Sequence, residues 1–388
     1  MLPVSFWTSL SLLLWTWAGY PALVFILPKG PPGSPGRSTE NTLRSPVTVT
    51  IIIPVHNAEN ALEGKLENCL ALDYPLDQFE ILVTADGCTD RSSDIAKNFA
   101  QAYPNVRFVE SLDRIGKSEA QNRAASSSSS DILLLTDVDS MLEPDALRVL
   151  MDSFCRPTVG CVTGHVKWQA AGNQSRANSE NLYWRFEHAL WTRESALGVL
   201  GWASGPCMAI RRELFQGIDP RYGDDVVLPL DVSQQRAQVI YAPKLVVIDK
   251  SVAHPAAALR ARARMTLRSF RGTVSKRDAF HPLRRPMLFC SIVSHKILRW
   301  ITPVFFIATF VSAIPLSVGG SLAARVVLAG QCAVLSAAAV GYAATRLRLN
   351  IPFVGSVYEL ALENMGMLLG VLRVLLGHQE VAYTSEDR

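Results

Sequence analysis

The apolar positions of this chain fall in long runs near both ends and in short runs between them. Residues from about 50 to 280 alternate short apolar segments with polar ones, whereas Trp7–Leu27 is uncharged and long enough to cross a bilayer. Its Trp and Tyr residues suit a membrane interface. A cleaved signal peptide is the alternative, but it needs a basic start, and no Lys or Arg precedes Lys29. The pattern therefore predicts an N-terminal transmembrane helix.

Three further apolar stretches follow towards the C-terminus. Ile301–Val318 and Leu322–Ala344 are predicted to span the membrane. Ile351–Leu376 is also apolar but carries Glu359 and Glu363, and charges at bilayer depth are costly. We expect that stretch either to span inside a helix bundle or to lie partly at the interface. If all four apolar segments span, both chain ends lie on the side opposite the middle region.

Basic residues near the apolar stretches predict the orientation, because Lys and Arg concentrate on the cytoplasmic side of membrane spans. Here they lie on the side of the middle region: Lys29, Arg37, Arg44, Arg284, Arg285, Lys296, Arg299, Arg346 and Arg348. We therefore expect a multi-pass protein of the inner cell membrane with a cytoplasmic middle domain. The formal net charge of +4 gives no case for a nucleic-acid partner, whereas the local basic residues favour membrane lipid.

Strand-like runs alternate with helical segments in the first half of the middle region. The runs are "VTVTIIIPV", "FEILVTAD", "VRFVES" and "DILLLTD". This alternation predicts an α/β fold with a mainly parallel, Rossmann-like sheet and flanking helices. Polar clusters follow three of the strands, as "PVHNAEN", "TADGCTD" and "TDVD". Ligands of such sheets bind at the carboxyl ends of the strands, so these clusters predict an active site there.

Two carboxylates, Asp137 and Asp139, stand at the end of an apolar run. A charge at such a place is costly to bury unless it is paired or binds a metal. Asp-x-Asp in a turn can direct both carboxylates to one side, and Mg²⁺ and Mn²⁺ prefer carboxylate and phosphate oxygens. A departing nucleoside diphosphate needs such a cation to neutralise its charge. The alternative interpretation is a helix cap.

Other polar residues at the strand ends have a functional and a structural interpretation. Asp86 ends the second strand and can accept hydrogen bonds from a base or ribose, or serve as a turn residue. Lys117 opens a helix after a Gly and can reach a phosphate, or remain a solvated charge. His56, considered alone, is expected to be structural.

The four clusters together resemble the nucleotide-binding half of an inverting family-2 glycosyltransferase with the GT-A fold. The resemblance rests on "PVHN", "DGCTD", "GKSEAQN" and "DVD", in this order and on these elements. It continues in the Gly-containing "SGPCMAIRRELF" and in "YGDDVVLPLDVSQQRAQVIYAP", and so covers residues from about 48 to 275. The chain is similar to membrane-anchored enzymes of the exopolysaccharide, cellulose and hyaluronan synthase type.

The resemblance implies roles for individual residues. Asp225 would be the general base, and because its neighbour Asp224 stands where the family often has Glu, the assignment is open to a shift by one residue. Asp139 and Asp137 would hold Mn²⁺ or Mg²⁺. Gly205 and Trp184 would lie on the acceptor side, although core packing is the favoured interpretation of the aromatic helix around Trp184. The implied nucleotide-sugar contacts are Pro54, His56, Asn57, Glu59, Asp86, Lys117, Asp137 and Arg264.

One motif departs from the processive members of the family. These carry Gln-x-x-Arg-Trp after the base, whereas this chain has "ARARM". Arg264 retains a cation that can hold a diphosphate, but the aromatic residue that would stack on an acceptor sugar is missing. Processive synthesis is therefore in doubt. The same segment could instead be a basic interfacial helix.

These features predict a membrane-bound glycosyltransferase that moves a sugar from a nucleotide donor, expected to be UDP-linked, to a polysaccharide or lipid-linked acceptor. The alternatives are a non-catalytic homologue within a polysaccharide assembly or export complex, and a nucleotidyltransferase. The seven widely spaced cysteines lack zinc-type spacing and are expected to be free thiols. The expected organisation is a membrane helix (1–28), a linker (29–47), the GT-A domain (48–280), an amphipathic interfacial segment (281–300), membrane helices (301–376) and a tail (377–388).

Overall fold

A computed structural model of the chain describes residues 2–28, 47–169, 174–250, 255–347, 349 and 351–379. The expected linker, except residue 47, and most of the expected tail lie outside this described part. Within it, all seven cysteines are free, as expected.

The centre of the middle domain is a single eight-stranded sheet with the order β3-β2-β1-β4-β7-β6-β8-β5. Its first half is parallel and comprises β1 (Val49–Val55), β2 (Phe79–Asp86), β3 (Val106–Ser111) and β4 (Ile132–Leu135). Successive β1 residues such as Ile51 and Ile52 belong to hydrophobic clusters on opposite faces of the sheet, and both are fully buried. This burial explains the continuous β-branched runs, which parallel strands covered on both faces require.

The second half of the sheet is mixed. β7 (Met208–Arg211) runs antiparallel to β4 and to β6 (Val159–Gln169), and β8 (Gln238–Lys250) runs parallel to β6. The short β5 (Met141–Leu142) adds antiparallel to β8. The predicted mainly parallel α/β sheet is therefore confirmed, with antiparallel pairs added after β4.

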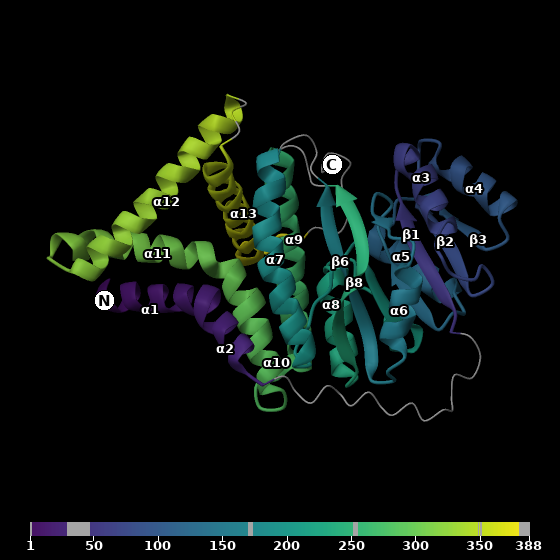
Figure 1. Cartoon of the computed structure of the whole chain (residues 1–388), viewed down its shortest axis with the longest axis horizontal. Coiled ribbons are helices and arrows are strands. Elements are labelled where there is room, and N and C mark those ends of the chain that lie inside the picture. Colours follow the sequence, from purple (N-terminus) through teal and green to yellow (C-terminus); the bar gives the residue numbers. More distant parts are fainter. Residues whose placement is uncertain are drawn as a thin grey trace.

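Helices cover both faces of the sheet (Figure 1). They are α3 (Glu59–Leu70), α4 (Ser92–Ala102), α5 (Lys117–Ser127), α6 (Ala146–Phe154) and α8 (Asp224–Gln234). Helices α3, α4 and α5 follow β1, β2 and β3 along the chain, as the alternating pattern predicts. Each of the three therefore begins close to the carboxyl end of a parallel strand.

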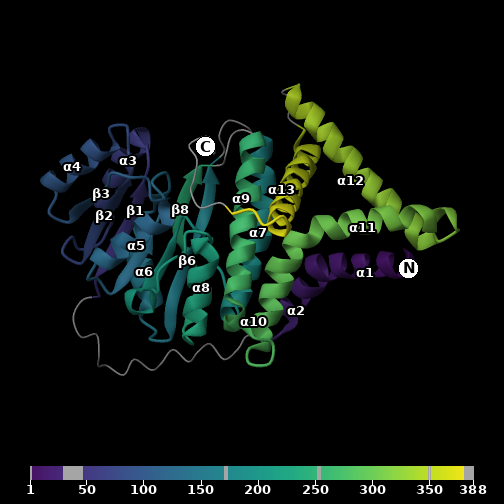
Figure 2. The same ribbon diagram turned by 180° about the vertical axis from the view of Figure 1, so that it is seen from behind.

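Two long helices, α7 (Gln174–Ala196) and α9 (Pro255–Ser275), stand between the sheet and the apolar helices, and both views show this arrangement (Figures 1 and 2). Helix α13 (Pro352–Leu375) packs along α9 and also touches α7 and α12. It is thus part of the layer that separates the sheet from the apolar helices.

Three helical stretches in the described part of the chain are long and apolar enough to cross a membrane, which indicates a membrane protein. The first, Leu2–Ile26, combines α1 (Leu2–Leu14), a π-helical turn and α2 (Tyr20–Ile26). The second, Pro286–Val318, combines α10 (Pro286–Ser291), another π-helical turn (Ile292–Ile297) and α11 (Leu298–Val318). The third is α12 (Leu322–Arg346).

Helix α13 is not among these candidate spans. It packs against α9, a helix of the middle domain, and also against the candidate spans α11 and α12, so it connects the domain to the apolar helices. Of the segment 281–300, expected to be amphipathic and interfacial, the residues from Pro286 onwards form the first part of the continuous helix Pro286–Val318, and this part packs against the middle domain.

Candidate functional site

The polar clusters that follow β1, β2 and β4 lie at one edge of the sheet. These strands are parallel neighbours in the order β2-β1-β4, so their carboxyl ends point the same way. The loops after Val55 and Asp86 and the turn containing Asp137 therefore meet there. This convergence is what the strand-end positions of the clusters predict.

Asp86 is buried and hydrogen-bonded to the protein itself. Its carboxylate accepts from the backbone N–H groups of Ile115, at 2.5 Å, and Gly116, at 2.9 Å. Gly116 has a φ of +88°, a conformation that favours glycine. His56 Nδ1 lies 2.6 Å from the carbonyl oxygen of Asp86. Asp86 therefore fixes the loop that opens α5, and with it the position of the next residue, Lys117.

The loop after β1 is joined to the loop after β2. Asn57, with a φ of +47°, accepts a hydrogen bond from the backbone N–H of Thr89 at 2.8 Å. Glu59 forms an exposed ion pair with Arg91 at 3.3 Å. Pro54 lies within β1, opposite Thr84 of β2. The predicted nucleotide contacts Pro54, Asn57 and Glu59 thus lie at the end of β1 and in the loop after it, next to the end of β2.

Lys117 connects two carboxylates from distant parts of the chain. Its Nζ lies 2.7 Å from Asp137 and 3.6 Å from Asp224. Burial acts to lower the pKa of Lys117, but the charges of Asp137 and Asp224 outweigh this effect and raise it, so the amine stays charged. The Asp-x-Asp turn and the start of α8 are therefore held together by a cation.

Asp137 and Asp139 differ in their surroundings. Asp137 is half-buried and paired with Lys117, whereas Asp139 is exposed. No group of three or more His, Cys, Asp or Glu side chains able to hold a metal occurs among the described residues. The turn nevertheless fits a divalent cation, because Mg²⁺-type sites use one or two carboxylates and take their other ligands from phosphate and water.

Asp224 and Asp225 begin α8, and they face different groups. Asp224 accepts a hydrogen bond from Gln121 at 3.2 Å and contacts Lys117. Burial raises the pKa of Asp224, but Lys117 and Arg268 outweigh it and lower the pKa. Burial and the charge of Asp224 together raise the pKa of Asp225 to about 6.

A cavity of about 350 Å³ lies between the middle domain and the apolar helices, and Asp225 is part of its wall. It receives residues from α7, α9 and α13, from the segment before β7, and from both apolar ends of the chain. Gly205 and Trp184, predicted on the acceptor side, both line it. Its aromatic wall contains Trp17, Trp168, Trp184, Trp191 and Trp300.

Three residues at this site were not predicted as site residues from the sequence, although Gln121 lies within the "GKSEAQN" motif. Arg268 of α9 donates hydrogen bonds to Ser118 Oγ at 3.2 Å and to the carbonyl of Tyr222 at 2.7 Å. Gln121 holds Asp224, as described above. Lys296 lines the cavity, with its Nζ 4.5 Å from the ring centroid of Trp202.

Arg264, the predicted diphosphate contact, lies on α9 one turn before Arg268. It is not among the residues that line the 350 Å³ cavity. The run of arginines in α9 indicates a cationic helix, but the helix rotation that places Arg268 next to Ser118 depends on packing.

A buried polar network lies behind the cavity. His295 places its ring nitrogens 2.7 Å from Glu194 and 3.1 Å from Glu187. Tyr20 of α2 donates to Glu194 at 2.6 Å, and Arg299 donates to Glu187. Because these five residues come from α2, α7 and the helix Pro286–Val318, the network joins the two apolar ends of the chain to the wall of the cavity.

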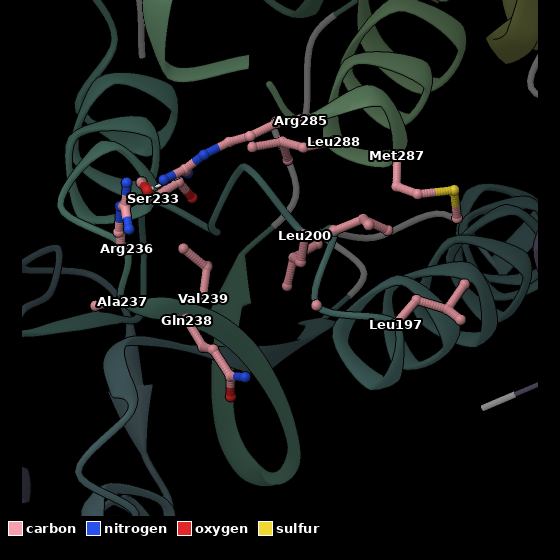
Figure 3. A pocket seen from close by; sticks show the side chains of 12 residues that line it. Leu197, Leu200, Ser233, Arg236, Ala237, Gln238, Val239, Arg285, Met287 and Leu288 are labelled. Atoms are coloured by element: carbon pink, nitrogen blue, oxygen red, sulfur yellow. Dashed lines mark hydrogen bonds between the residues drawn. The ribbon is translucent and has the colours of Figure 1, made fainter. Parts of the chain in front are cut away.

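A second cavity, of about 320 Å³, lies where α7, α8, β8 and α10 meet (Figure 3). Arg285 and Arg236 extend towards Ser233 on one side of it, and Leu200 and Met287 lie on the other. Arg285 donates to the carbonyl of Ser233 in the last turn of α8. A helix C-terminus favours such a cation, which accounts for Arg285 without a ligand.

The chain is similar to known glycosyltransferases over much of its middle domain. Residues 50–218 match the model of glycosyl transferase family 2. An N-acetylglucosaminyltransferase of Sinorhizobium fredii is 26% identical over 248 residues, which cover 59% of this chain and 59% of that protein. A hyaluronan synthase of Streptococcus pyogenes is 31% identical over 195 residues, which cover 48% of this chain and 45% of that protein. The chain thus spans about half the length of these relatives.

A solved structure shares the fold over nearly the whole chain. It is a mannosyltransferase from Pyrobaculum calidifontis in complex with GDP-Man and Mn²⁺, with a TM-score of 0.68 and 20% identity, covering 97% of both chains. The match includes the sheet and the apolar helices at both ends. It confirms the predicted GT-A fold with membrane-type helices on either side of the domain.

Proposed function

Because residues 50–218 form a glycosyl transferase family 2 domain, we propose that the protein is a membrane-bound inverting glycosyltransferase. One observation carries the proposal. Lys117 joins the Asp-x-Asp turn to Asp224, and Asp225, the next residue, opens onto a cavity large enough for a sugar. A donor site and an acceptor site therefore share one boundary, as direct transfer between two sugars requires.

The donor is proposed to bind along the edge formed by the first three strand-end loops and the Asp-x-Asp turn. Lys117 and Arg268 supply the positive charge that a diphosphate needs, and Arg268 is oriented by Ser118 and Tyr222. Asp137 and Asp139 would hold Mn²⁺ or Mg²⁺, which neutralises charge on the diphosphate when bound. A UDP-linked sugar is the expected donor, and GDP-linked sugars are the first alternative to test.

Asp225 is proposed as the general base. It accepts the proton of the acceptor hydroxyl while that oxygen attacks the anomeric carbon, and the bond from this carbon to the diphosphate oxygen breaks, with inversion. A pKa of about 6 suits this role near neutral pH, because the carboxylate is ionised yet basic. Asp224, held by Lys117 and Gln121, stays ionised and positions the start of α8.

The acceptor is proposed to enter the tryptophan-lined cavity. Aromatic faces stack on sugar rings, and the buried indole N–H groups of Trp168 and Trp191 have no hydrogen-bond partner among the described residues. These groups can donate to sugar hydroxyls. Trp17 belongs to the first candidate span, so the cavity adjoins the membrane helices. This position favours a lipid-linked or polysaccharide acceptor over a soluble one.

The proposed location is the inner membrane, with the domain in the cytoplasm, where nucleotide sugars are available. Polysaccharide assembly or export proteins are the proposed partners. A non-catalytic homologue is the competing proposal. The presence of Lys117, Asp137 and Asp225 in one connected site argues against it, because an inactive subunit needs no acid of raised pKa beside an acceptor cavity.

The test uses full-length protein purified in detergent and screened over UDP- and GDP-sugars with and without Mn²⁺. We expect metal-dependent transfer or hydrolysis with one donor, lost in Asp139→Ala. Asp225→Asn is expected to lose transfer while it retains nucleotide binding. Nucleotide binding without turnover in the presence of acceptor lipids, or unimpaired transfer by Asp225→Asn, contradicts the proposal.

A further inference from the structure

Lys65 of α3 is fully buried beneath the turn that carries Asp137 and Asp139. Its side chain is 0% exposed. Nζ donates a hydrogen bond to Thr136 Oγ1 at 3.1 Å and another to the carbonyl oxygen of Ser140. These two partners directly flank the Asp-x-Asp segment, and both are buried. A single amine therefore holds both ends of the turn.

Asn68, three residues further along α3, holds the same segment at a third point. Its side-chain amide donates to the carbonyl of Leu142 at 2.8 Å, and its oxygen accepts from the backbone N–H of Leu142 at 2.9 Å. This pair of bonds satisfies the backbone of β5 at the residue opposite Val247 of β8. Positions three apart lie on one face of a helix, so Lys65 and Asn68 form one polar face of α3.

An amine in this position is costly for the fold. Burial disfavours a charged group unless it is paired, and no Asp or Glu lies within ion-pair distance of Lys65 among the described residues. Its neighbours Leu62 and Leu66 on α3 are fully buried in the hydrophobic core, where an apolar side chain would be favoured. Within the described residues, both side-chain hydrogen bonds of Lys65 go to the turn.

We propose that Lys65 and Asn68 are positioning residues that preorganise the Asp137–Asp139 turn for the metal and the diphosphate. The assignment of this turn to the donor site rests on the proposed function. That α3 holds the shape of the turn does not depend on it. Neither side chain points into the donor site, and both act through the backbone or hydroxyl of the turn. In known metal sites, residues that do not touch the metal but hydrogen-bond to its ligands orient those ligands, and Lys65 and Asn68 would act in the same way.

Positioning and simple electrostatics predict opposite effects of removing the amine. The charge of Lys65 repels a divalent cation, so Lys65→Met would strengthen Mn²⁺ binding if charge alone mattered. If Lys65 fixes the turn, its removal disorders both carboxylates and weakens Mn²⁺ binding, by about tenfold or more. The sign of the change therefore separates the two explanations.

The first experiment measures hydrogen–deuterium exchange of residues 136–142 in full-length protein without metal or nucleotide. We expect Lys65→Met and Asn68→Ala to exchange at least about tenfold faster than wild type in this segment. Leu82→Ala, which makes a cavity on the other face of the sheet, is the control for general destabilisation. It should lower the melting temperature without a selective change at residues 136–142.

The second experiment titrates the same three variants with Mn²⁺, read by the electron paramagnetic resonance of the free ion. Weaker binding in Lys65→Met and Asn68→Ala, but not in Leu82→Ala, supports positioning. Unchanged exchange, or tighter Mn²⁺ binding in Lys65→Met, overturns it. If wild type binds no Mn²⁺, the metal assignment of the proposed function fails, while the exchange measurement still tests whether α3 holds the turn.

Discussion

Asp224 and Asp225 are adjacent acids whose surroundings shift their pKa values in opposite directions. Lys117 and Arg268 overcome the burial of Asp224 and keep its pKa low, whereas burial and the charge of Asp224 raise the pKa of Asp225. One residue type in two environments thus yields a permanently ionised group and a group that titrates near pH 6. When two neighbouring acids have separated pKa values, the one with the raised pKa is the candidate general base.

The pH dependence of transfer follows from this pair. Asp225 acts as a base only when ionised, so kcat/KM should fall about tenfold per pH unit below pH 6. Asp224→Asn removes the negative neighbour, which favours ionised Asp225 and moves the acid limb to lower pH, whatever the loss in absolute rate. Profiles of kcat/KM between pH 4.5 and 8 for wild type and Asp224→Asn check this. An acid limb that stays at the same pH, or moves to higher pH, in Asp224→Asn contradicts the prediction.

At the scale of elements, helix contacts decide where the site residues lie. Gly366 and Gly370 are spaced four apart on α13 and allow it to approach α9 closely. A Cβ at Gly370 would stand 2.6 Å from Thr266 Cβ, and one at Gly366 would stand 2.7 Å from Arg262 Cβ. Small residues at this spacing let two helices pack backbone to backbone. Thr266 and Arg262 line the cavity, so this helix contact shapes its wall.

Gly370→Leu is therefore expected to separate α13 from α9. Overpacking of this kind costs about 1–3 kcal/mol, and it should lower both the melting temperature in detergent and the transfer rate, with donor binding retained. Gly330→Leu on α12 is the matched control, because a Cβ there meets nothing within 4 Å. Equal effects of the two substitutions would show that the α9–α13 contact has no special role.

At the scale of the whole molecule, the apolar ends of the chain are joined through the domain. Tyr20, near the end of the first candidate span, is hydrogen-bonded to Glu194 of α7, and α7 is connected through His295 to the second. Two candidate spans, α11 with its preceding turn and α12, follow the domain, and α13 comes after them. If both of these spans cross the membrane, the chain returns after α12 to the side from which it left.

Residues after α12 are thus expected on the same side as the catalytic domain. Green fluorescent protein fused after Arg388 should fluoresce in a bacterial inner membrane, and alkaline phosphatase fused there should be inactive. Fusions after Gly319, between the two candidate spans, should give the reverse pattern and serve as the control. Active phosphatase at the C-terminal fusion would mean that α13 crosses the membrane as well.

The order of the motifs along the chain was sufficient to predict that the strand-end clusters meet at one edge of the sheet. Runs such as "VTVTIIIPV" and "DILLLTD" carry the β-branched pattern of buried parallel strands, and parallel neighbours bring their carboxyl ends together. Local sequence also located the three candidate spans, because length and hydropathy are properties of a single segment. Both predictions depend on residues close together in the chain.

Contacts between distant residues were decided only by the tertiary structure. Lys65 reads as an ordinary surface lysine in "LEGKLENCL", yet packing of α3 buries it under a turn more than seventy residues away. Arg268, and not Arg264, reaches Ser118 because the rotation of α9 is set by α8 and α13. Likewise, Asp225 faces the cavity and Asp224 faces Lys117 because α8 begins where the two sites meet. Helix rotation and long-range pairing minimise the energy of the whole core, so no local pattern encodes them.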